Sequence, residues 1–219
     1  MDDRHFDQNT AEDWIDTVEG EKGGVRTIDL YPNLREWQIR VEPKEILDIG
    51  CGQGICSDKM NLSHCRYTGV EPSPFLLERA KHLYPETNKQ FVEGNAYSLP
   101  FPDDYFDAAF SIAVWHLLED KTKAATELSR ILKNGGHFMI AAANPEIYDE
   151  WMKTYTGGKK DGCRFEGYMQ KENGTKSIDT LYLHSFDEIV ASLNSANLEV
   201  QNTMKFRTAI SIQGQKRIG

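Results

Sequence analysis

The chain has 219 residues, a length that fits one α/β domain with a modest insertion and a substantial core. Hydrophobic residues make up 39% of it and aromatic residues 11%, which is ordinary for a globular protein and argues against wholesale disorder. The formal net charge of −9 speaks against a general nucleic-acid binder, which needs an extended basic face. No run reaches the roughly 18 apolar residues of a membrane helix, and the acidic N-terminus lacks the apolar segment of a signal peptide. We therefore expect a cytoplasmic protein without a membrane span.

The N-terminal part of the chain has a helical pattern in two pieces. The pieces are Thr10–Glu19 and Pro32–Val41, separated by a glycine-rich break at residues 21–24. Proline suits the first turn of a helix, so Pro32 marks the start of the second piece. We expect two helices ahead of the main sheet.

From Glu45 onward, apolar strands alternate with helices of about ten to fifteen residues, which is typical of βαβ units and a parallel sheet. The predicted strands are Glu45–Ile49, Arg66–Glu71, Gln90–Glu93, Phe106–Ser111 and His137–Ala142. The predicted helices are Gly54–Leu62, a helix that Pro74 opens after a Ser73 cap with Leu76, Leu77, Ala80 and Leu83 on its apolar face, and Asp120–Leu132, ended by Gly135-Gly136.

Residues 145–184 interrupt this alternation. Two β-like runs, Phe165–Gln170 and Ser177–His184, flank Asn173-Gly174, which is a strong hairpin-turn signal. We expect an inserted β-hairpin that forms a lid over the domain.

The C-terminal part of the chain closes the sheet. A capping box at residues 185–188 opens a helix that reaches about Ala196. Glu199–Phe206 and Ala209–Gln213 then form a plausible antiparallel pair. The fold class expected is therefore α/β, a Rossmann-like doubly wound sheet of seven mostly parallel strands with an antiparallel edge strand.

A glycine turn after the first predicted strand carries the strongest functional signal. It reads Asp48-Ile49-Gly50-Cys51-Gly52-Gln53-Gly54, and its glycines permit positive φ angles and close approach of a ligand to the backbone. Ligands of open α/β sheets bind at the carboxyl ends of the strands, where this turn lies.

Two cofactor classes compete for this turn. A dinucleotide fingerprint, G-x-G-x-x-G, requires a third glycine at position 55, where this chain has Ile55. The carboxylate of Asp48 would repel a pyrophosphate but attract the ammonium group of an amino acid. The pattern favours S-adenosylmethionine over a dinucleotide.

The four cysteines do not indicate a metal site or a nucleophile. They form no C-x-x-C pair and no zinc pattern, and we interpret them as reduced thiols. Cys51 lies in the glycine turn without a basic neighbour that would lower its pKa, so a small residue that fits is the better interpretation.

Polar residues at the next two strand ends extend the site. Glu71 follows the glycine turn by about 20 residues, where an acidic side chain can accept hydrogen bonds from ribose hydroxyls; a solvated carboxylate is the alternative. Asn95 and Ala96 follow the third strand and are suited to hold an adenine by its edge and one face.

Five segments, at residues 46–54, 67–73, 93–107, 111–120 and 128–138, together resemble class I S-adenosylmethionine-dependent methyltransferases, in particular the type 11-like group with ubiquinone- and menaquinone-biosynthesis enzymes. The resemblance implies S-adenosylmethionine as cofactor. It implies that the methionine portion lies over Asp48, Gly50, Cys51, Gly52 and Gly54, the ribose at Glu71 and Pro72, the adenine at Asn95 and Ala96, and the cofactor's edge at Ser111. The family commonly has Asp where Asn95 stands, so we expect a weaker contact there.

The sequence pattern and the resemblance together divide the single domain into four parts. These are N-terminal cofactor-covering helices (1–42), a cofactor-binding core (43–144), a lid insertion (145–184) and a C-terminal helix with antiparallel strands (185–219). In the covering part, Tyr31 and Arg26 are candidates to touch the cofactor.

Methyl transfer relies mainly on positioning and water exclusion, and a base is needed only if the acceptor arrives protonated. His116, after the fourth strand, is the best candidate for a base and His184 the second, since a histidine pKa near 6.5 suits proton removal. A structural polar contact is the open alternative for both.

The acceptor cannot be named from the sequence, although its pocket can be placed. We expect it between residues 1–35 and the insertion, whose aromatic residues either stack on a substrate or pack the lid. The main hypothesis is a small-molecule methyltransferase. The alternatives are a non-catalytic cofactor-binding or regulatory protein and an RNA or protein methyltransferase. Residues 111–114 lack the Asn/Asp-Pro-Pro-aromatic run of DNA adenine methyltransferases. A homodimer is one option for the oligomeric state.

Overall fold

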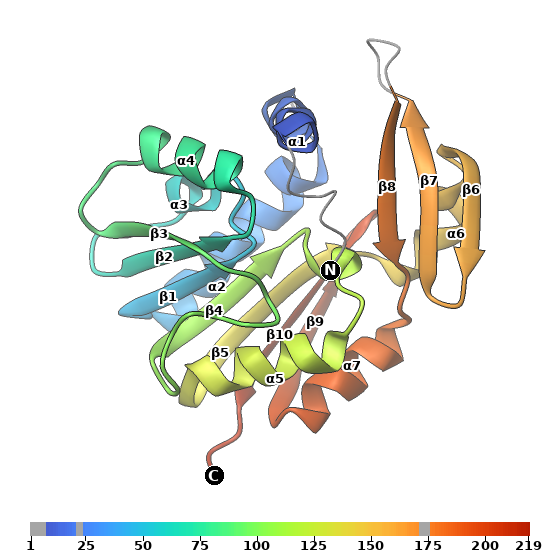
Figure 1. Cartoon of the computed structure of the whole chain (residues 1–219). Coiled ribbons are helices and arrows are strands. Elements are labelled where there is room, and N and C mark those ends of the chain that lie inside the picture. The colour runs from blue at the N-terminus through green and yellow to red at the C-terminus, as the bar shows by residue number, and fades with distance from the viewer. Residues whose placement is uncertain (1–7, 21–23, 171–175) are drawn as a thin grey trace.

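The computed structural model describes residues 8–20, 24–170 and 176–219 (Figure 1). A seven-stranded sheet with the order β3-β2-β1-β4-β5-β10-β9 forms its centre, and a three-stranded sheet, β6-β7-β8, stands beside it. The central strands are β1 (Glu45–Ile49), β2 (Arg66–Glu71), β3 (Lys89–Glu93), β4 (Phe106–Ile112), β5 (Leu132–Ala143), β9 (Leu198–Lys205) and β10 (Ala209–Lys216). The strands of the smaller sheet are β6 (Tyr155–Asp161), β7 (Arg164–Gln170) and β8 (Lys176–Tyr182).

Helices cover both faces of the central sheet. The longer ones are α1 (Gln8–Gly20), α2 (Tyr31–Val41), α4 (Pro74–Leu83), α5 (Lys121–Ile131) and α7 (Phe186–Ser195). The shorter ones are η2 (Arg26–Leu30), α3 (Cys56–Lys59), η3 (Trp115–Leu117), η4 (Pro145–Ile147) and α6 (Tyr148–Met152). None of the described helices is long and apolar enough to cross a membrane.

Alternating side chains of the strands divide the core into two layers. In β1, Leu47 packs in the cluster that holds α5 and α7, whereas Ile46 packs in the cluster that holds α2, α3 and α4. Leu128 of α5 and Trp37 of α2 are among the buried side chains of these two layers. This arrangement explains why β1 is buried throughout, since a parallel strand covered on both faces has no solvent side.

The predicted doubly wound, mostly parallel sheet is confirmed. The strands β1, β2, β3, β4 and β5 pair in parallel, and β10 pairs antiparallel with both β5 and β9. The antiparallel strand therefore lies one place in from the edge, and β9 is outermost. The bounds predicted for β1 and β2 agree with the structure, and the Ser73 hydroxyl accepts from the Leu76 N–H to cap α4.

The helix predicted at residues 54–62 is wrong in length, because α3 covers only Cys56–Lys59. Gly54 has a φ of +83°, which a right-handed helix excludes. At the other end, the Gln38 amide pairs with both backbone groups of Asn61. This contact from α2 replaces the hydrogen bonds that would have continued the helix.

Two details of the following helices also differ from the prediction. Leu83, expected on the apolar face of α4, is 42% exposed. Helix α5 ends at Ile131, ahead of Gly135-Gly136, because the N–H groups of Asp104 and Tyr105 donate to its last carbonyls. The two glycines lie within β5, where Gly135 has a φ of +74°.

The insertion contains one strand more than predicted. Strands β7 and β8 form the expected antiparallel pair, and β6, which the sequence analysis missed, pairs with the other edge of β7. The predicted turn at Asn173-Gly174 lies outside the described residues. The capping box between Ser185 and Glu188 is confirmed at the start of α7.

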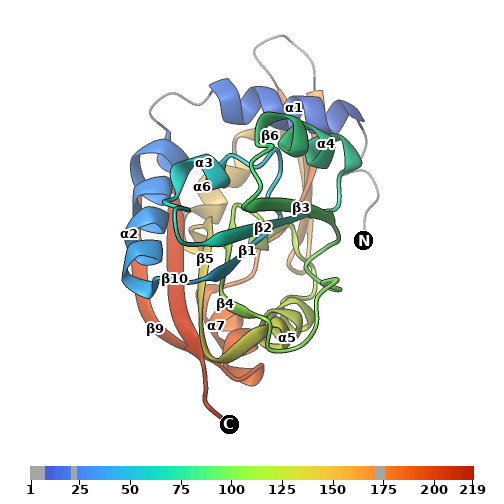
Figure 2. The same cartoon turned by 90° about the vertical axis from the view of Figure 1, so that its left-hand side faces the viewer.

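Figures 1 and 2 place α1 beside α4, beyond the carboxyl ends of β1 and β2. The three-stranded sheet stands near the same end of the central sheet, on the side away from α4. The N-terminal helix and the insertion thus border the end of the sheet at which the glycine turn lies.

Candidate functional site

The glycine turn between β1 and α3 is anchored on the neighbouring strand. Gly50, Gly52 and Gly54 have φ angles of +76°, +54° and +83°, a region in which glycine carries no steric penalty. The N–H groups of Gly50 and Cys51 both donate to the carbonyl of Val70, over 2.8 and 3.0 Å. The turn is therefore a fixed part of the sheet's edge.

Glu71 joins this turn to the start of α4. Its Oε2 accepts from the Gly52 N–H and its Oε1 from the Ser73 N–H, each over 3.0 Å. The residue is 7% exposed, and burial raises its pKa to about 7 although the two backbone hydrogen bonds act in the opposite direction. Each carboxylate oxygen can accept a further hydrogen bond, so contact of Glu71 with ribose hydroxyls stays a prediction.

Asp48 lies beneath the turn and is 1% exposed. The hydroxyl of Tyr67 donates to its carboxylate over 2.6 Å. Burial raises the pKa of Asp48 to about 7, the Tyr67 hydrogen bond lowers it, and the nearby Glu71 raises it again. A cation placed beside Asp48 would favour its ionised form.

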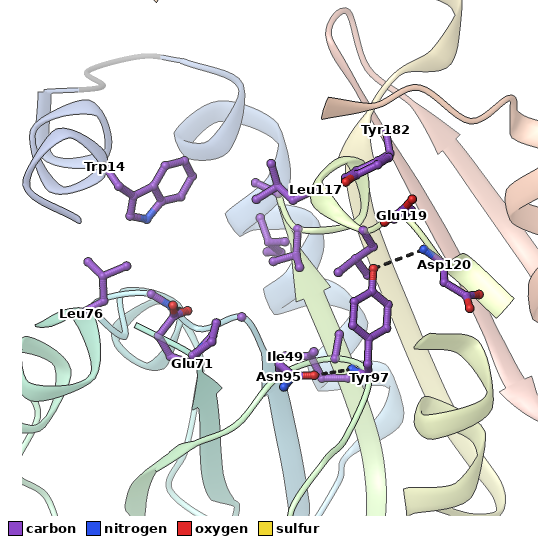
Figure 3. Close-up of a pocket in the computed structure, with 18 of the residues that line it drawn as sticks. Trp14, Ile49, Glu71, Leu76, Asn95, Tyr97, Leu117, Glu119, Asp120 and Tyr182 are labelled. Carbon is purple, nitrogen blue, oxygen red and sulfur yellow. Dashed lines mark hydrogen bonds between the residues drawn. The ribbon is translucent and has the colours of Figure 1, made fainter. Parts of the chain in front are cut away.

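A cavity of about 390 Å³ opens beside the turn (Figure 3). Its polar wall is ordered: Asn95 Oδ1 accepts from the Tyr97 N–H over 2.9 Å, and the Tyr97 hydroxyl accepts from the Asp120 N–H over 3.2 Å. Figure 3 shows Trp14 and Leu76 on one side and Tyr182 on the other. The lining residues are Ala11, Trp14, Ile49, Gly50, Gly52, Glu71, Pro72, Leu76, Asn95, Ala96, Tyr97, Ile112, Ala113, Val114, Leu117, Leu118, Glu119, Asp120, Lys123 and Tyr182.

A smaller cavity of about 40 Å³ lies on the other side of the turn. Its lining residues are Trp14, Val18, Arg26, Tyr31, Asp48, Gly50, Cys51, Gly52, Gln53, Ile55, Cys56, Ile112 and Ala113. The two cavities share walls, so they lie next to each other at the turn; the shared residues are Trp14, Gly50, Gly52, Ile112 and Ala113. The guanidinium of Arg26 lies 5.0 Å from the centre of the Trp14 ring.

Most of the predicted cofactor residues come together around these cavities. Those at the smaller cavity are Arg26, Tyr31, Asp48, Gly50, Cys51 and Gly52, and those at the larger one are Gly50, Gly52, Glu71, Pro72, Asn95 and Ala96. Burial raises the pKa of the Cys51 thiol well above its usual range, which agrees with a small packing residue.

Gly54, Ser111 and His116 line neither cavity. A Cβ on Gly54 would lie 2.9 Å from the Phe91 ring, so this glycine permits close packing of the turn. Ser111 is buried in β4, and its hydroxyl has no hydrogen-bond partner among the described residues. The His116 ring packs edge-to-face on Trp151, with centroids 5.4 Å apart.

The second candidate base also lies outside the cavity lining. His184 is half-buried, with Nε2 3.2 Å from the carbonyl oxygen of Glu119. Burial and Lys121 lower the pKa of His184, so the ring is neutral at neutral pH. It holds the segment that leads into α5 and has no direct access to the cavity.

Sequence reasoning missed several walls of the larger cavity. Trp14 could have been found as a large apolar residue on a mostly polar helix. Tyr97 could have been found because it directly follows the predicted Asn95-Ala96 pair. Of the aromatic residues expected from the insertion, Tyr182 lines the cavity. Trp151, Tyr155 and Phe165 instead pack with one another and Tyr148 inside the lid.

The residues present fit S-adenosylmethionine. The smaller cavity offers a carboxylate (Asp48), an amide (Gln53) and a guanidinium (Arg26), which complement an amino-acid group. The larger one offers Glu71 and apolar walls for a nucleoside. A Cβ on Gly52 would lie 3.1 Å from the Trp14 Nε1, so the junction of the two spaces depends on that glycine. Among the residues described, no group of three or more His, Cys, Asp or Glu side chains is arranged to hold a metal ion.

The chain is similar to known methyltransferases in sequence and in fold. Residues 47–140 match the model of a methyltransferase domain family. The fatty-acid O-methyltransferase of Mycolicibacterium smegmatis is 33% identical over 129 residues, which are 57% of this chain and 46% of that protein. The chain spans about half the length of the curated relatives it matches.

Solved structures share the fold at lower identity. A Mesorhizobium loti S-adenosylmethionine-dependent methyltransferase has a TM-score of 0.64 and 18% identity, covering 88% of this chain and 98% of its own. The PH0226 protein from Pyrococcus horikoshii has a TM-score of 0.72 and 16% identity, covering 97% and 95%. The narrower resemblance to ubiquinone- and menaquinone-type enzymes stays a prediction. Residues 47–140 thus match the methyltransferase domain family, the chain has the fold of class I S-adenosylmethionine-dependent methyltransferases, and S-adenosylmethionine is the cofactor that this family and fold imply.

Proposed function

We propose that this chain transfers a methyl group from S-adenosylmethionine to a small lipophilic acceptor held in the larger cavity. The observation that carries the proposal is that two cavities share Gly50 and Gly52 as walls, one lined by charged groups and one mainly by apolar side chains. In this proposal Asp48 and Arg26 hold the amino-acid end of the cofactor, and Glu71 holds its ribose. Asn95 and Ala96 hold the adenine.

S-adenosylmethionine supplies a methyl group activated by a sulfonium. The chain's own contribution is then to orient the acceptor and to exclude water. Trp14 from α1 and Tyr182 from β8 lie on opposite sides of the cavity, and Val114 and Leu117 add apolar lining. Positioning by these walls is the main source of catalysis in this proposal.

The lining favours an acceptor whose reactive atom is already unprotonated. Of the ionisable groups in the wall, Glu71, Tyr97 and Asp120 have hydrogen bonds with the backbone, and the others are Glu119, Lys123 and Tyr182. His116 and His184 lie outside the lining. A carboxylate needs no base, and an anion meeting a sulfonium cancels charge, which low-polarity surroundings favour. The relative from Mycolicibacterium smegmatis is named for a fatty acid, which supports lipophilic acids as the first acceptors to test.

The test separates binding from transfer. Calorimetry with S-adenosylhomocysteine measures the first, and mass spectrometry after incubation with S-adenosylmethionine and a panel of fatty acids, phenols, quinols and hydrophobic amines measures the second. We expect binding, and methylation of a lipophilic acid ahead of the amines. Absence of binding would overturn the proposal, and binding without transfer to any acceptor, RNA and protein included, would identify a non-catalytic cofactor-binding protein.

A further inference from the structure

Gln53, in the glycine turn, connects the smaller cavity to the helix α1 that covers the larger one. Its side chain is buried, with the residue 2% exposed, and it lines the smaller cavity. Its Nε2 donates to Glu19 Oε1 of α1 over 3.4 Å, a long hydrogen bond. The same oxygen accepts from Arg79 Nη2 of α4 over 2.5 Å. We call this set the Gln53–Glu19–Arg79 chain.

The amide oxygen at the other end of Gln53 is buried and has no hydrogen-bond partner in the described part of the molecule. Leaving such an acceptor unpaired is unfavourable, so a donor that enters the smaller cavity gains by pairing with it. Asp48 in the same cavity selects for a cationic donor. An ammonium group satisfies both requirements.

Helix α1 contributes walls to both cavities. Trp14 contributes to both cavities, and Ala11 is a wall of the larger one. Arg26 packs over the Trp14 ring. An isolated exposed ion pair such as Glu19–Arg79 contributes little by itself. These contacts of α1 lie at the two cavities, where a ligand bound at the turn can strengthen them.

We propose that Gln53 is a positioning residue that couples occupancy of the smaller cavity to closure of α1 over the larger cavity. Its amide oxygen accepts from the cofactor's ammonium group while its amide nitrogen holds Glu19. An amide that accepts at oxygen is a better donor at nitrogen, because hydrogen bonds in a chain polarise one another. This inference rests on the cofactor assigned in the proposed function.

Coupling of this kind is reciprocal. If the cofactor's amino-acid group favours the closed helix, the closed helix raises affinity for the cofactor by the same factor. Methylthioadenosine keeps the nucleoside but has no ammonium group, so it gives Gln53 no donor. Comparison of S-adenosylhomocysteine with methylthioadenosine therefore separates two effects. One is the filling of the larger cavity, and the other is the closure of α1 that depends on the ammonium group.

Hydrogen exchange of the α1 amides at residues 11–20 tests the coupling. We expect S-adenosylhomocysteine to slow exchange about tenfold and methylthioadenosine to leave it nearly unchanged, a size typical of coupling between sites. Gln53→Ala should abolish the slowing and raise the Kd for S-adenosylhomocysteine by a similar factor. Its Kd for methylthioadenosine should not change. Arg79→Ala, outside both cavities, should have the same effect in weaker form.

Two further variants keep the test specific. Asp16→Asn changes an exposed charge on the same helix and should behave as wild type. Gln53→Glu sets a carboxylate against Glu19 and should open α1, while adding Glu19→Gln restores a donor and an acceptor and should recover the slowing. If Gln53→Ala keeps the slowing, or methylthioadenosine produces it equally, the coupling is disproved. If S-adenosylhomocysteine does not bind the wild type at all, the proposed function fails instead.

Discussion

The hydroxyl of Tyr67 donates a 2.6 Å hydrogen bond to the carboxylate of Asp48, directly below the glycine turn. Both side chains are buried, each with 1% exposure. This hydrogen bond and a weaker one from the Cys56 thiol do not offset the loss of water, and the pKa of Asp48 is about 7. The pKa of Glu71 is also about 7. The candidate cofactor site therefore holds two carboxyl groups that change charge near neutral pH.

The contribution of Asp48 to the free energy of unfolding should fall as the pH rises from about 5 to about 8. The folded pKa of Asp48 lies above its unfolded value of 3.8, so between these values the folded state holds a proton that the unfolded state has lost. The contribution of Asp48 to stability is fully present below its unfolded pKa, and it is lost as the pH rises to and beyond its folded pKa. The loss is on the order of 3 kcal/mol.

Urea unfolding of the wild type and of Asp48→Asn at both pH values checks this prediction. The variant cannot titrate at position 48, so it should gain stability relative to the wild type as pH rises. Parallel pH profiles for the two proteins would contradict it, and comparison of the two cancels the contribution of all other groups.

Binding of S-adenosylhomocysteine should strengthen as pH rises from about 5.5 to about 7.5, because a nearby ammonium group favours the ionised form of Asp48. Below the folded pKa, binding must release a proton, and the affinity should rise up to about tenfold per pH unit. Calorimetry in two buffers with different ionisation enthalpies counts the released protons. Asp48→Asn should release fewer, and an affinity that does not change with pH in the wild type would be evidence against this linkage.

Sequence patterns sufficed for β1, β2 and the glycine turn because local chemistry determines them. The run at Glu45–Ile49 that ends in glycines predicts the buried strand β1, and Gly50 and Gly52 have the positive φ angles that such a turn requires. Helix α3 was overestimated because Gln38, from a different helix, takes the backbone groups of Asn61. A contact between distant segments leaves no periodic pattern in the local sequence.

The walls of the larger cavity show the same limit. Asn95 and Ala96 could be predicted because they follow a recognisable strand, whereas Trp14 and Tyr182 reach the cavity from opposite ends of the chain. His116 was placed correctly in the sequence after the fourth strand. The short helix η3 nevertheless turns its ring onto Trp151, an orientation that hydrophobic periodicity does not predict.

Gly52→Ala should weaken S-adenosylhomocysteine binding more than it weakens folding. A Cβ there would lie 3.1 Å from the Trp14 Nε1, at the junction of the two cavities, and Trp14 can move with its helix. Gly50→Ala should cost more stability, since its Cβ would collide with Val114 in the cavity wall. Each substitution also carries backbone strain of about 1–2 kcal/mol from its positive φ.

Gly135→Ala is the matched control for that strain. It has a φ of +74°, and the nearest atom to a new Cβ is 3.6 Å away, outside the site. Thermal unfolding and calorimetry of the three variants should rank Gly50→Ala lowest in Tm and leave the binding affinity of Gly135→Ala unchanged. Equal affinity of Gly52→Ala and Gly135→Ala would show that the junction tolerates a methyl group.

His116→Phe should retain turnover within about threefold, far from the loss of about 100-fold or more that removal of a general base causes. Its ring lies against Trp151 and outside the cavity lining, and phenylalanine can keep that edge-to-face packing. Tyr182→Ala should instead raise the KM for a lipophilic acceptor by about tenfold, as expected when a large apolar contact is lost. Its Kd for S-adenosylhomocysteine should stay near the wild-type value, because Tyr182 lies away from the turn, across the cavity from Trp14 and Glu71. Steady-state kinetics with the best acceptor of the panel decide both points. A collapse of kcat in His116→Phe with normal cofactor binding would restore His116 as a catalytic base.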